Sequence, residues 1–350
     1  MAMDPPRASI VVVSSVNAEG LESCLLSIVA HTSSEVPFET IVVLNDAEDD
    51  VRAVLHRAQA SVKVVQSSVN RGFAGGCNLG RTAAKGEFIV LLHDDSEVEE
   101  GWLSALVRCA DEHSQAGAVG GRVLDPDGRL QLAGAVLWRD ATTTAVGPDN
   151  PDGYLERRPV DYAGTSVLLV RATTWDAIGG MDERFYPAYF ADVDMAMSIR
   201  RLGQIVLYEP RSRIRHHTGA SSSSRFKAFV GPRNCELLRT KWARELELHE
   251  ERSETLDRAL ERTRLEAERL RVAPPPPAPP PPSSKAEDPA DAELRFLRMD
   301  GGFREAYAAE LKEELAGLQA AGPAKESELA EVSAELERVI SRRAAPSRTG

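Results

Sequence analysis

The sequence predicts an α/β fold with a mostly parallel sheet, followed by a C-terminal helical extension. Up to about Thr240, short runs of β-branched residues alternate with amphipathic stretches, the pattern of strands and helices wound into one sheet. Beyond that point the chain becomes dense in Glu, Arg and Leu and contains two proline runs. The 350 residues are 42% hydrophobic and 27% charged, which excludes wholesale disorder and a fibrous chain.

Four apolar runs in the first hundred residues are typical of buried strands, and the stretches between them have helical spacing. The expected strands are Ile10–Val13, Glu39–Leu44, Val62–Gln66 and Phe88–Leu92. The expected helices are Leu21–Ala30, Asp49–Ala60, Gly76–Ala84 and Trp102–Glu112. This alternation builds βαβ units, in which ligands bind beyond the carboxyl ends of the strands.

Composition divides the chain into four expected parts. They are a main domain over residues 1–240, a charged helix over 241–272, a proline-rich linker over 273–290 and a coiled-coil-like helical segment over 291–343. Proline runs cannot continue a helix and favour an extended spacer. Leucines and valines of the last part recur at spacings of three and four, so its helices need a partner. Packing within the chain and self-association into a homo-oligomer both satisfy that need.

Net charge and cysteine content limit the kinds of partner and the cellular compartment that we expect. With 54 acidic and 42 basic residues the formal net charge is −12, which argues against a nucleic acid polymer as partner. The four cysteines form no C-x-x-C pair, which argues against a zinc ribbon or disulfide framework and favours the reducing cytoplasm. Apolar runs are too short to cross a bilayer, so membrane contact is expected to be peripheral at most.

Polar residues follow the first strands, where a ligand is expected. Ser14 follows the first strand, and Asn45 and Asp46 follow the second. The glycine-rich segment Asn70–Gly80 opens a helix and can bring backbone N–H groups close to a phosphate or ribose. The first strand lacks the G-x-G-x-x-G fingerprint and the chain lacks a Walker A sequence, so a Rossmann dehydrogenase and a P-loop ATPase are disfavoured.

The most informative strand end is the run His93, Asp94 and Asp95 directly after Phe88–Leu92. Acidic groups at the end of a buried strand need compensation, and a divalent cation bridging to a diphosphate would supply it. The alternative is that both aspartates cap a helix beginning near Glu99. The residues by themselves leave both interpretations open.

Several segments, taken in order along the first 240 residues, resemble family 2 of the GT-A glycosyltransferases, in its rhamnosyltransferase-like branch. The resemblance is carried by Ser9–Asn17, Asn70–Gly80, Leu91–Asp95, Tyr162–Arg171, Ile178–Phe185, Ala191–Asp194 and Arg215–Ser221. It implies a GT-A fold and a nucleotide-sugar donor. Two departures stand out: His93 replaces the usual Asp or Asn, and Ala191 replaces the Glu before Asp192. The second departure removes an acidic neighbour that would raise the pKa of Asp192.

The resemblance also assigns roles. It implies that Asp95 and His216 hold Mn²⁺ or Mg²⁺ and that Asp192 is the catalytic base, with its place at a helix N-terminus as the alternative explanation. His216 is preferred to His217, since neighbours on an extended segment point to opposite faces. The expected donor-binding residues are Ser14, Asn45, Asp46, Arg71, Gly76, Asn78, His93 and Asp94. The expected acceptor-side residues are Gly164 and Thr165.

The implied reaction is metal-dependent, inverting transfer of a sugar from a UDP- or dTDP-sugar to a hydroxyl of a cell-surface polysaccharide, glycolipid or other glycan. It would take place in the cytoplasm, at or near the inner membrane. The alternative function is a non-catalytic nucleotide-sugar-binding or assembly protein that oligomerises through its C-terminal helices. A nucleotidyltransferase is disfavoured, because its glycine-rich, basic N-terminal signature is absent.

Overall fold

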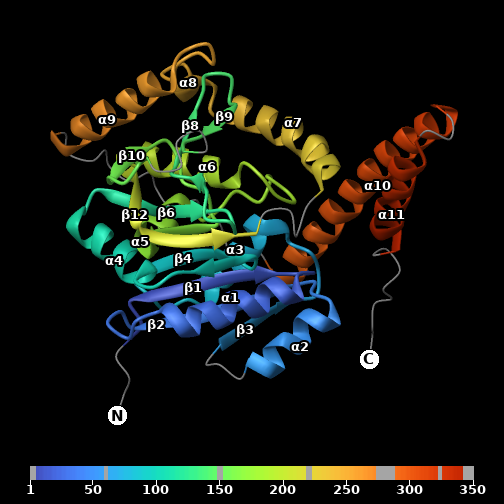
Figure 1. Cartoon of the computed structure of the whole chain (residues 1–350), viewed down its shortest axis with the longest axis horizontal. Helices are drawn as coiled ribbons and strands as arrows, with labels where there is room; N and C mark the ends of the chain where they lie inside the picture. The colour runs from blue at the N-terminus through green and yellow to red at the C-terminus, as the bar shows by residue number, and fades with distance from the viewer. Residues whose placement is uncertain are drawn as a thin grey trace. The chain divides into compact units, whose positions relative to one another are not determined.

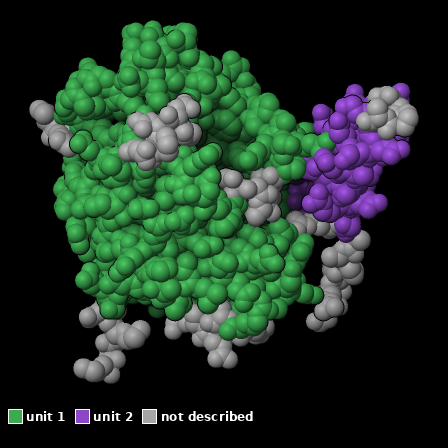
Figure 2. All heavy atoms as spheres, viewed as in Figure 1, with its two compact units in different colours: residues 1–284 green, residues 285–350 purple. Residues whose placement is uncertain are grey.

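The computed structural model describes residues 5–58, 62–147, 153–217, 223–272, 288–321 and 325–341. The chain divides into two compact units, residues 1–284 and 285–350 (Figure 2). Most of the expected proline-rich linker, residues 273–287, lies outside the described residues. Among the described helices, none combines the length and the apolar character that a membrane span requires.

A mostly parallel sheet forms the centre of the first unit, as predicted (Figure 1). Its main path has the order β10-β12-β6-β11-β4-β1-β2-β3, in which β11 is antiparallel to both neighbours and β10 is antiparallel to β12. The strands of this path are β1 (Ala8–Ser14), β2 (Phe38–Asn45), β3 (Val62–Ser67), β4 (Phe88–His93), β6 (Ala116–Leu124), β10 (Arg158–Val160), β11 (Val167–Arg171) and β12 (Ile205–His216). The short strands β5 (Ser96–Val98) and β7 (Leu130–Leu132) pair with β12 and β6, and β8 (Ala135–Leu137) pairs with β9 (Thr143–Ala145).

Helices cover both faces of this sheet, because side chains alternate along each buried strand. Ile10 and Val12 of β1 face a core shared with α1 (Ala18–His31), α2 (Asp49–Ala58) and α4 (Trp102–Glu112). Val11 faces the opposite core, shared with α3 (Gly72–Ala83), α5 (Ala172–Ile178) and α6 (Ala191–Arg201). The two cores hold the strands rigidly, so the residues at their carboxyl ends have fixed positions.

Two details of the predicted elements were wrong. The run Val62–Gln66 is not a buried strand: β3 lies at the edge of the sheet with β2 as its neighbour, and Val64 is 47% exposed. The glycine-rich helix begins at Gly72 rather than Gly76. Gly72 has φ +64°, which glycine adopts without strain, and its N–H donates to Asn70 Oδ1 at 2.8 Å, so this turn starts the helix early.

The stretch 241–272, expected as one charged helix, is divided in the structure. The helix α7 (Ser224–Lys241) is followed by α8 (Ala243–Leu246) and, after a break, by α9 (Leu256–Val272). The helix α9 packs on β10 and β8, within the first unit. Its Arg262 donates from Nη2 to Asp161 Oδ2 at 2.6 Å, and Arg200 of α6 donates from Nη1 to Asp161 Oδ1 at 3.0 Å. Part of the charge on α9 thus forms ion pairs within the unit.

The second unit is a pair of helices, α10 (Pro289–Ala321) and α11 (Glu326–Ser341), which pack against each other (Figure 1). Leu311 and Val332 are buried. The Tyr307 hydroxyl donates to Glu335 Oε1 at 2.5 Å, which joins the two helices. The apolar stripes seen in the sequence therefore have a partner within this unit.

Candidate active site

A sharp reversal of the chain after β4 builds the centre of the site. His93 ends β4, and β5 begins at Ser96 and pairs antiparallel with the end of β12, where Ser96 lies opposite His216. The His217 N–H donates to the Asp95 carbonyl oxygen at 2.9 Å, which ties the reversal to β12. The aspartates do not cap a helix, because α4 begins at Trp102 after Gly101, with β5 in between.

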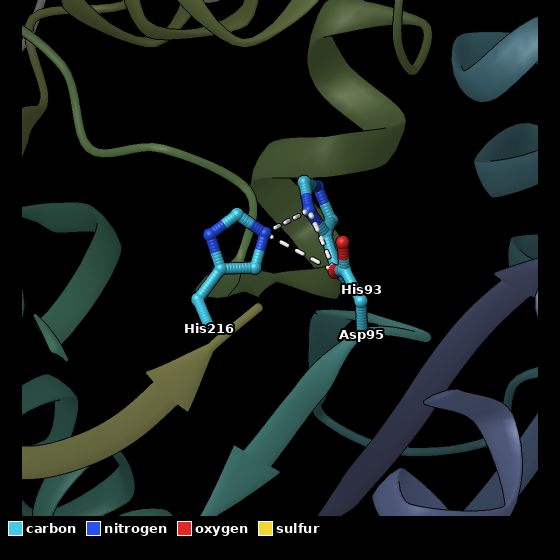
Figure 3. Close-up of side chains that lie close together, drawn as sticks. All are labelled: His93, Asp95 and His216. Carbon is cyan, nitrogen blue, oxygen red and sulfur yellow. Dashed lines mark hydrogen bonds and ion pairs between the residues drawn. The ribbon is translucent and has the colours of Figure 1, made fainter. Parts of the chain in front are cut away.

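Three side chains converge at this reversal. Figure 3 shows His93, Asp95 and His216 pointing toward one another, and their possible ligand atoms all lie within 4.8 Å of one another. His216 Nε2 lies 3.1 Å from Asp95 Oδ1 and 3.3 Å from His93 Nδ1, whereas His93 Nδ1 and Asp95 Oδ1 are 3.9 Å apart. The adjacent His217 ring instead lies against Glu97 Oε1, at 2.9 Å. His216 thus faces the cluster and His217 faces away from it.

Burial and mutual contact set the charges of this cluster. Burial, together with the His216 ring, lowers the pKa of His93 to about 4, so this imidazole is neutral at neutral pH. Burial alone would raise the pKa of Asp95, but the neighbouring His216 holds it below its usual value. Burial raises the pKa of Asp94 to about 7, although Ser14 Oγ donates to its Oδ2 atom at 2.6 Å.

The cluster fits a divalent cation. Asp95 Oδ1 is buried and accepts no hydrogen bond from the described residues. Ligand atoms about 2.1 Å from one ion lie about 3.0–3.4 Å apart at angles of about 90–110°. The distances from His216 Nε2 to Asp95 Oδ1 and to His93 Nδ1, 3.1 and 3.3 Å, fall in that range, whereas the distance from His93 Nδ1 to Asp95 Oδ1, 3.9 Å, exceeds it. One carboxylate with imidazoles suits Mn²⁺ and other first-row metals better than Ca²⁺.

The expected donor-side residues near β2 and α3 hold one another. Asn45 Nδ2 donates to Gly72 O at 3.1 Å, and Asn45 Oδ1 accepts from Arg71 N at 2.8 Å. Asp46 has φ +54° and donates from its backbone N–H to Ser67 O at 3.1 Å. These bonds fix the backbone where β2 and β3 end, beside the start of α3.

Gly76 and Asn78 join α3 to its surroundings. A Cβ atom on Gly76 would lie 2.6 Å from Val13 Cγ1, so the glycine allows α3 to approach β1. Asn78 Nδ2 donates to Met181 O at 2.9 Å, and Asn78 Oδ1 accepts from Met181 N at 2.9 Å. The contacts of these two residues are thus within the protein framework, whereas Ser14 contacts Asp94 at the strand ends.

The segment between β10 and β11 reaches the cluster at Thr165, whose Oγ1 atom lies 3.1 Å from His93 Nε2. Burial raises the pKa of Tyr162, three residues earlier, and the negative charge of Asp192 raises it further. Of the two expected acceptor-side residues, Thr165 thus lies beside His93, and Gly164 precedes it in the chain.

Asp192 lies in the first turn of α6, whose N-cap is Phe190. Its Oδ1 atom accepts a hydrogen bond from Val193 N at 2.9 Å. Burial raises its pKa to about 6 against the lowering effect of that hydrogen bond. The sequence indicated only that no acidic neighbour precedes Asp192 to raise its pKa, and in the structure it is burial that raises it. A carboxylate with this pKa is suited to take up a proton near neutral pH.

Sequence reasoning missed Gln131, a residue beside the site. Gln131 of β7 approaches His216 Nδ1 to 2.8 Å with its Oε1 atom and donates to Asp125 from Nε2 at 2.6 Å. It has no sequence signal, since a lone Gln in a short strand is unremarkable. Asn234, which lies in an Arg-Asn pair that resembles the same family, donates to the backbone oxygens of Ala188 and Tyr189, just before α6.

The fold and the cluster at its carboxyl edge define a protein of the GT-A class. The structure of GalNAc-T7 with UDP, GalNAc and Mn²⁺ shares this fold with a TM-score of 0.55, at 16% identity, over 70% of this chain and 49% of that one. Residues 9–154 match the family described as Glycosyl transferase family 2. The chain therefore carries a Glycosyl transferase family 2 domain, as the sequence motifs predicted.

Two relatives extend the comparison. The chain is 28% identical over 228 residues to the uncharacterized protein y4gI of Sinorhizobium fredii, covering 62% of this chain and 25% of that protein. It is 26% identical over 215 residues to the N-acetylglucosaminyl-diphospho-decaprenol L-rhamnosyltransferase of Mycobacterium tuberculosis, covering 54% of this chain and 70% of that enzyme. The match thus spans about a quarter of the first relative and most of the second.

Proposed function

We propose that this chain is an inverting glycosyltransferase that moves a sugar from a UDP- or dTDP-sugar to a hydroxyl of a glycan or lipid-linked acceptor. The convergence of His93, Asp95 and His216 at the carboxyl edge of a family 2 domain is the observation that carries the proposal. The mycobacterial relative, named for rhamnosyl transfer to a decaprenol-linked sugar, supports a lipid-linked acceptor. The free cysteines support a reducing compartment, the cytoplasm, with at most peripheral membrane contact.

Each part of the site has a role in this reaction. Asp95 and His216, with His93 as a third ligand, would hold Mn²⁺ or Mg²⁺, and the bound ion would neutralise charge on the departing diphosphate. Asp192 takes the proton of the acceptor hydroxyl as that oxygen attacks the anomeric carbon. One displacement with one base inverts the configuration of the sugar.

The remaining residues bind the substrates. The donor side is formed by Ser14, Asn45, Asp46, Arg71 and Asp94, and Gly76 and Asn78 contribute to it by holding α3 in place. Gly164 and Thr165 lie on the acceptor side, supported by the contact between Thr165 and His93. The alternative of a non-catalytic assembly protein has less support, because α10 and α11 pack on each other.

Replacing Asp95 with Asn should weaken Mn²⁺ binding more than about 100-fold and remove donor turnover, since an amide is a far poorer ligand than a carboxylate. Calorimetry with Mn²⁺ and UDP measures binding, and mass spectrometry of a UDP- and dTDP-sugar panel measures turnover. The matched control is Asp127→Asn, an exposed acid on the turn after β6, which should match wild type. Metal-independent turnover, unchanged in Asp95→Asn, would contradict the proposed metal dependence of the reaction.

Donor turnover should follow the ionisation of Asp192. Burial raises the pKa of this carboxyl to about 6. The base acts only when ionised, so kcat/KM should rise about tenfold per pH unit below pH 6 and level off above it. A pH profile measured at saturating Mn²⁺ checks this. A midpoint near 4, the value of an exposed carboxyl, would show that burial does not control the base.

A further inference from the structure

The hairpin of β6 and β7 contacts the Nδ1 side of the His216 ring through Gln131. Its turn is closed by backbone hydrogen bonds from Asp125 N to Arg129 O at 2.8 Å and from Gly128 N to Asp125 O at 2.9 Å. Gln131 follows on β7, so its side chain lies between the Asp125 carboxylate and the His216 ring. The three residues form a continuous hydrogen-bonded chain that ends at the metal-ligand cluster.

Hydrogen-bonding chemistry fixes the direction of this chain. A carboxylate only accepts, so the amide nitrogen of Gln131 must face Asp125, at 2.6 Å. The amide oxygen then faces His216 Nδ1 at 2.8 Å and also only accepts, so Nδ1 must carry a hydrogen. A neutral imidazole carries one ring hydrogen, which leaves a lone pair on Nε2. That is the atom 3.1 Å from Asp95 Oδ1.

We propose that Gln131, oriented by Asp125, is a positioning residue that holds His216 in the tautomer able to bind a divalent cation. The inference rests on the proposed function, because it assumes that the cluster holds the metal. Groups that hydrogen-bond to the second nitrogen of a ligating histidine fix its tautomer and orientation, and their loss typically costs 10–100-fold in metal affinity. Gln131 touches neither the metal-ligand atoms nor Asp192 in the described hydrogen bonds, so it acts through His216 alone.

The test combines a spectroscopic measurement with a binding measurement. In metal-free protein labelled with ¹⁵N-histidine, two-bond ¹H–¹⁵N correlation spectra report the tautomer, and His216→Asn identifies the His216 signals. Wild type should show Nδ1–H, and Gln131→Met should lose this preference and bind Mn²⁺ about 10–100-fold more weakly. The double variant Gln131→Glu with Asp125→Asn keeps an acceptor oxygen beside Nδ1 and supplies an amide donor in place of the Asp125 carboxylate, so it should restore the Nδ1–H form. Arg129→Ala, on the exposed turn of the same hairpin, is the matched control.

The outcomes separate this inference from the proposed function. Wild-type tautomer and wild-type Mn²⁺ affinity in Gln131→Met would overturn the role of Gln131 while leaving the enzyme proposal intact. A wild-type protein that neither binds Mn²⁺ nor consumes any donor would overturn the proposed function. The tautomer measurement in metal-free protein needs no activity, so an Nε2–H form of His216 in wild type would by itself refute the inference.

Discussion

Replacing Asp192 with Asn should reduce sugar transfer by about 10²–10⁴-fold and yet raise the melting temperature of the protein. An amide cannot take up the acceptor proton, which accounts for the loss of rate. The gain in stability follows from burial, which raises the pKa of Asp192 from 3.8 to about 6. An ionised carboxylate at this position therefore destabilises the folded state at neutral pH, by about 1–3 kcal/mol.

The sign of this effect depends on pH. Because the folded-state pKa is raised, the folded protein is favoured below pH 4, where Asp192 is protonated in both states, and the favourable term is lost as the pH rises through about 6. Calorimetry should therefore show a higher melting temperature for Asp192→Asn at pH 7 and no difference near pH 3.5. Asp182→Asn is a control for which the opposite change in melting temperature is expected. Asp182 accepts a hydrogen bond from Lys241 Nζ at 2.8 Å, so this substitution should lower the melting temperature. Retained transfer in Asp192→Asn would exclude it as the base.

The second large effect is expected at Asp161, where Asp161→Asn should destabilise the protein by about 3–5 kcal/mol. This carboxylate is buried and accepts from Arg262, from Arg200 and from the backbone N–H of Leu137 at 2.9 Å. Removing its charge takes away the fully buried acidic partner of two largely buried guanidinium groups, which then keep only the more exposed Glu266, shared by both, and Glu250 on Arg262. Because Asp161 joins α9 to β10 and α6, the loss should free α9 from the first unit.

Urea unfolding measures this prediction, and hydrogen exchange on α9 locates it. The guanidinium groups of Arg200 and Arg262 hold the pKa of Asp161 below its usual value despite burial. Asp161 therefore stabilises the folded protein above pH 4, and this stabilisation is lost as the pH falls further. The free energy of unfolding of the variant should accordingly fall less steeply at acid pH than that of wild type. Glu261→Gln, in an exposed pair with Arg264 on the same helix, should leave the urea midpoint unchanged. Equal midpoints for both variants would contradict the prediction.

The sequence predicted the central strands of the sheet better than its edge strand and the helices that follow the sheet. The runs that became β1, β2 and β4 are apolar on both faces, and this pattern identifies central strands directly. Val62–Gln66 contains Lys63 and Gln66 among its valines and lies at the edge of the sheet, where polar side chains can reach solvent. The break between α8 and α9 was also hidden, because the segment between them contacts Leu137 and Arg139, more than a hundred residues earlier in the chain.

The roles expected of the site residues stay predictions, and the structure shows which of these residues lie together. The order of motifs indicated that Asp95 and His216 meet, and the pairing of β5 with β12 places His216 Nε2 3.1 Å from Asp95 Oδ1. His93 was assigned to the donor because of its place in the motif, whereas its ring joins the cluster, an outcome of the tight reversal after β4. Gln131 could not be predicted from the sequence, because its proposed role depends on which of its side-chain atoms contacts His216, and only the structure shows that contact.

The short segment from Tyr162 to Thr165 has a consequence for how the proposed activity could change during evolution. The charge of Asp192 acts on Tyr162 at one end, and Thr165 at the other end contacts His93. If the proposed roles of Asp192 and His93 hold, an insertion or deletion inside these residues would affect proton removal and cation binding together. New acceptor preferences should therefore arise from changes in neighbouring loops, while the length of this segment stays constant among functional descendants.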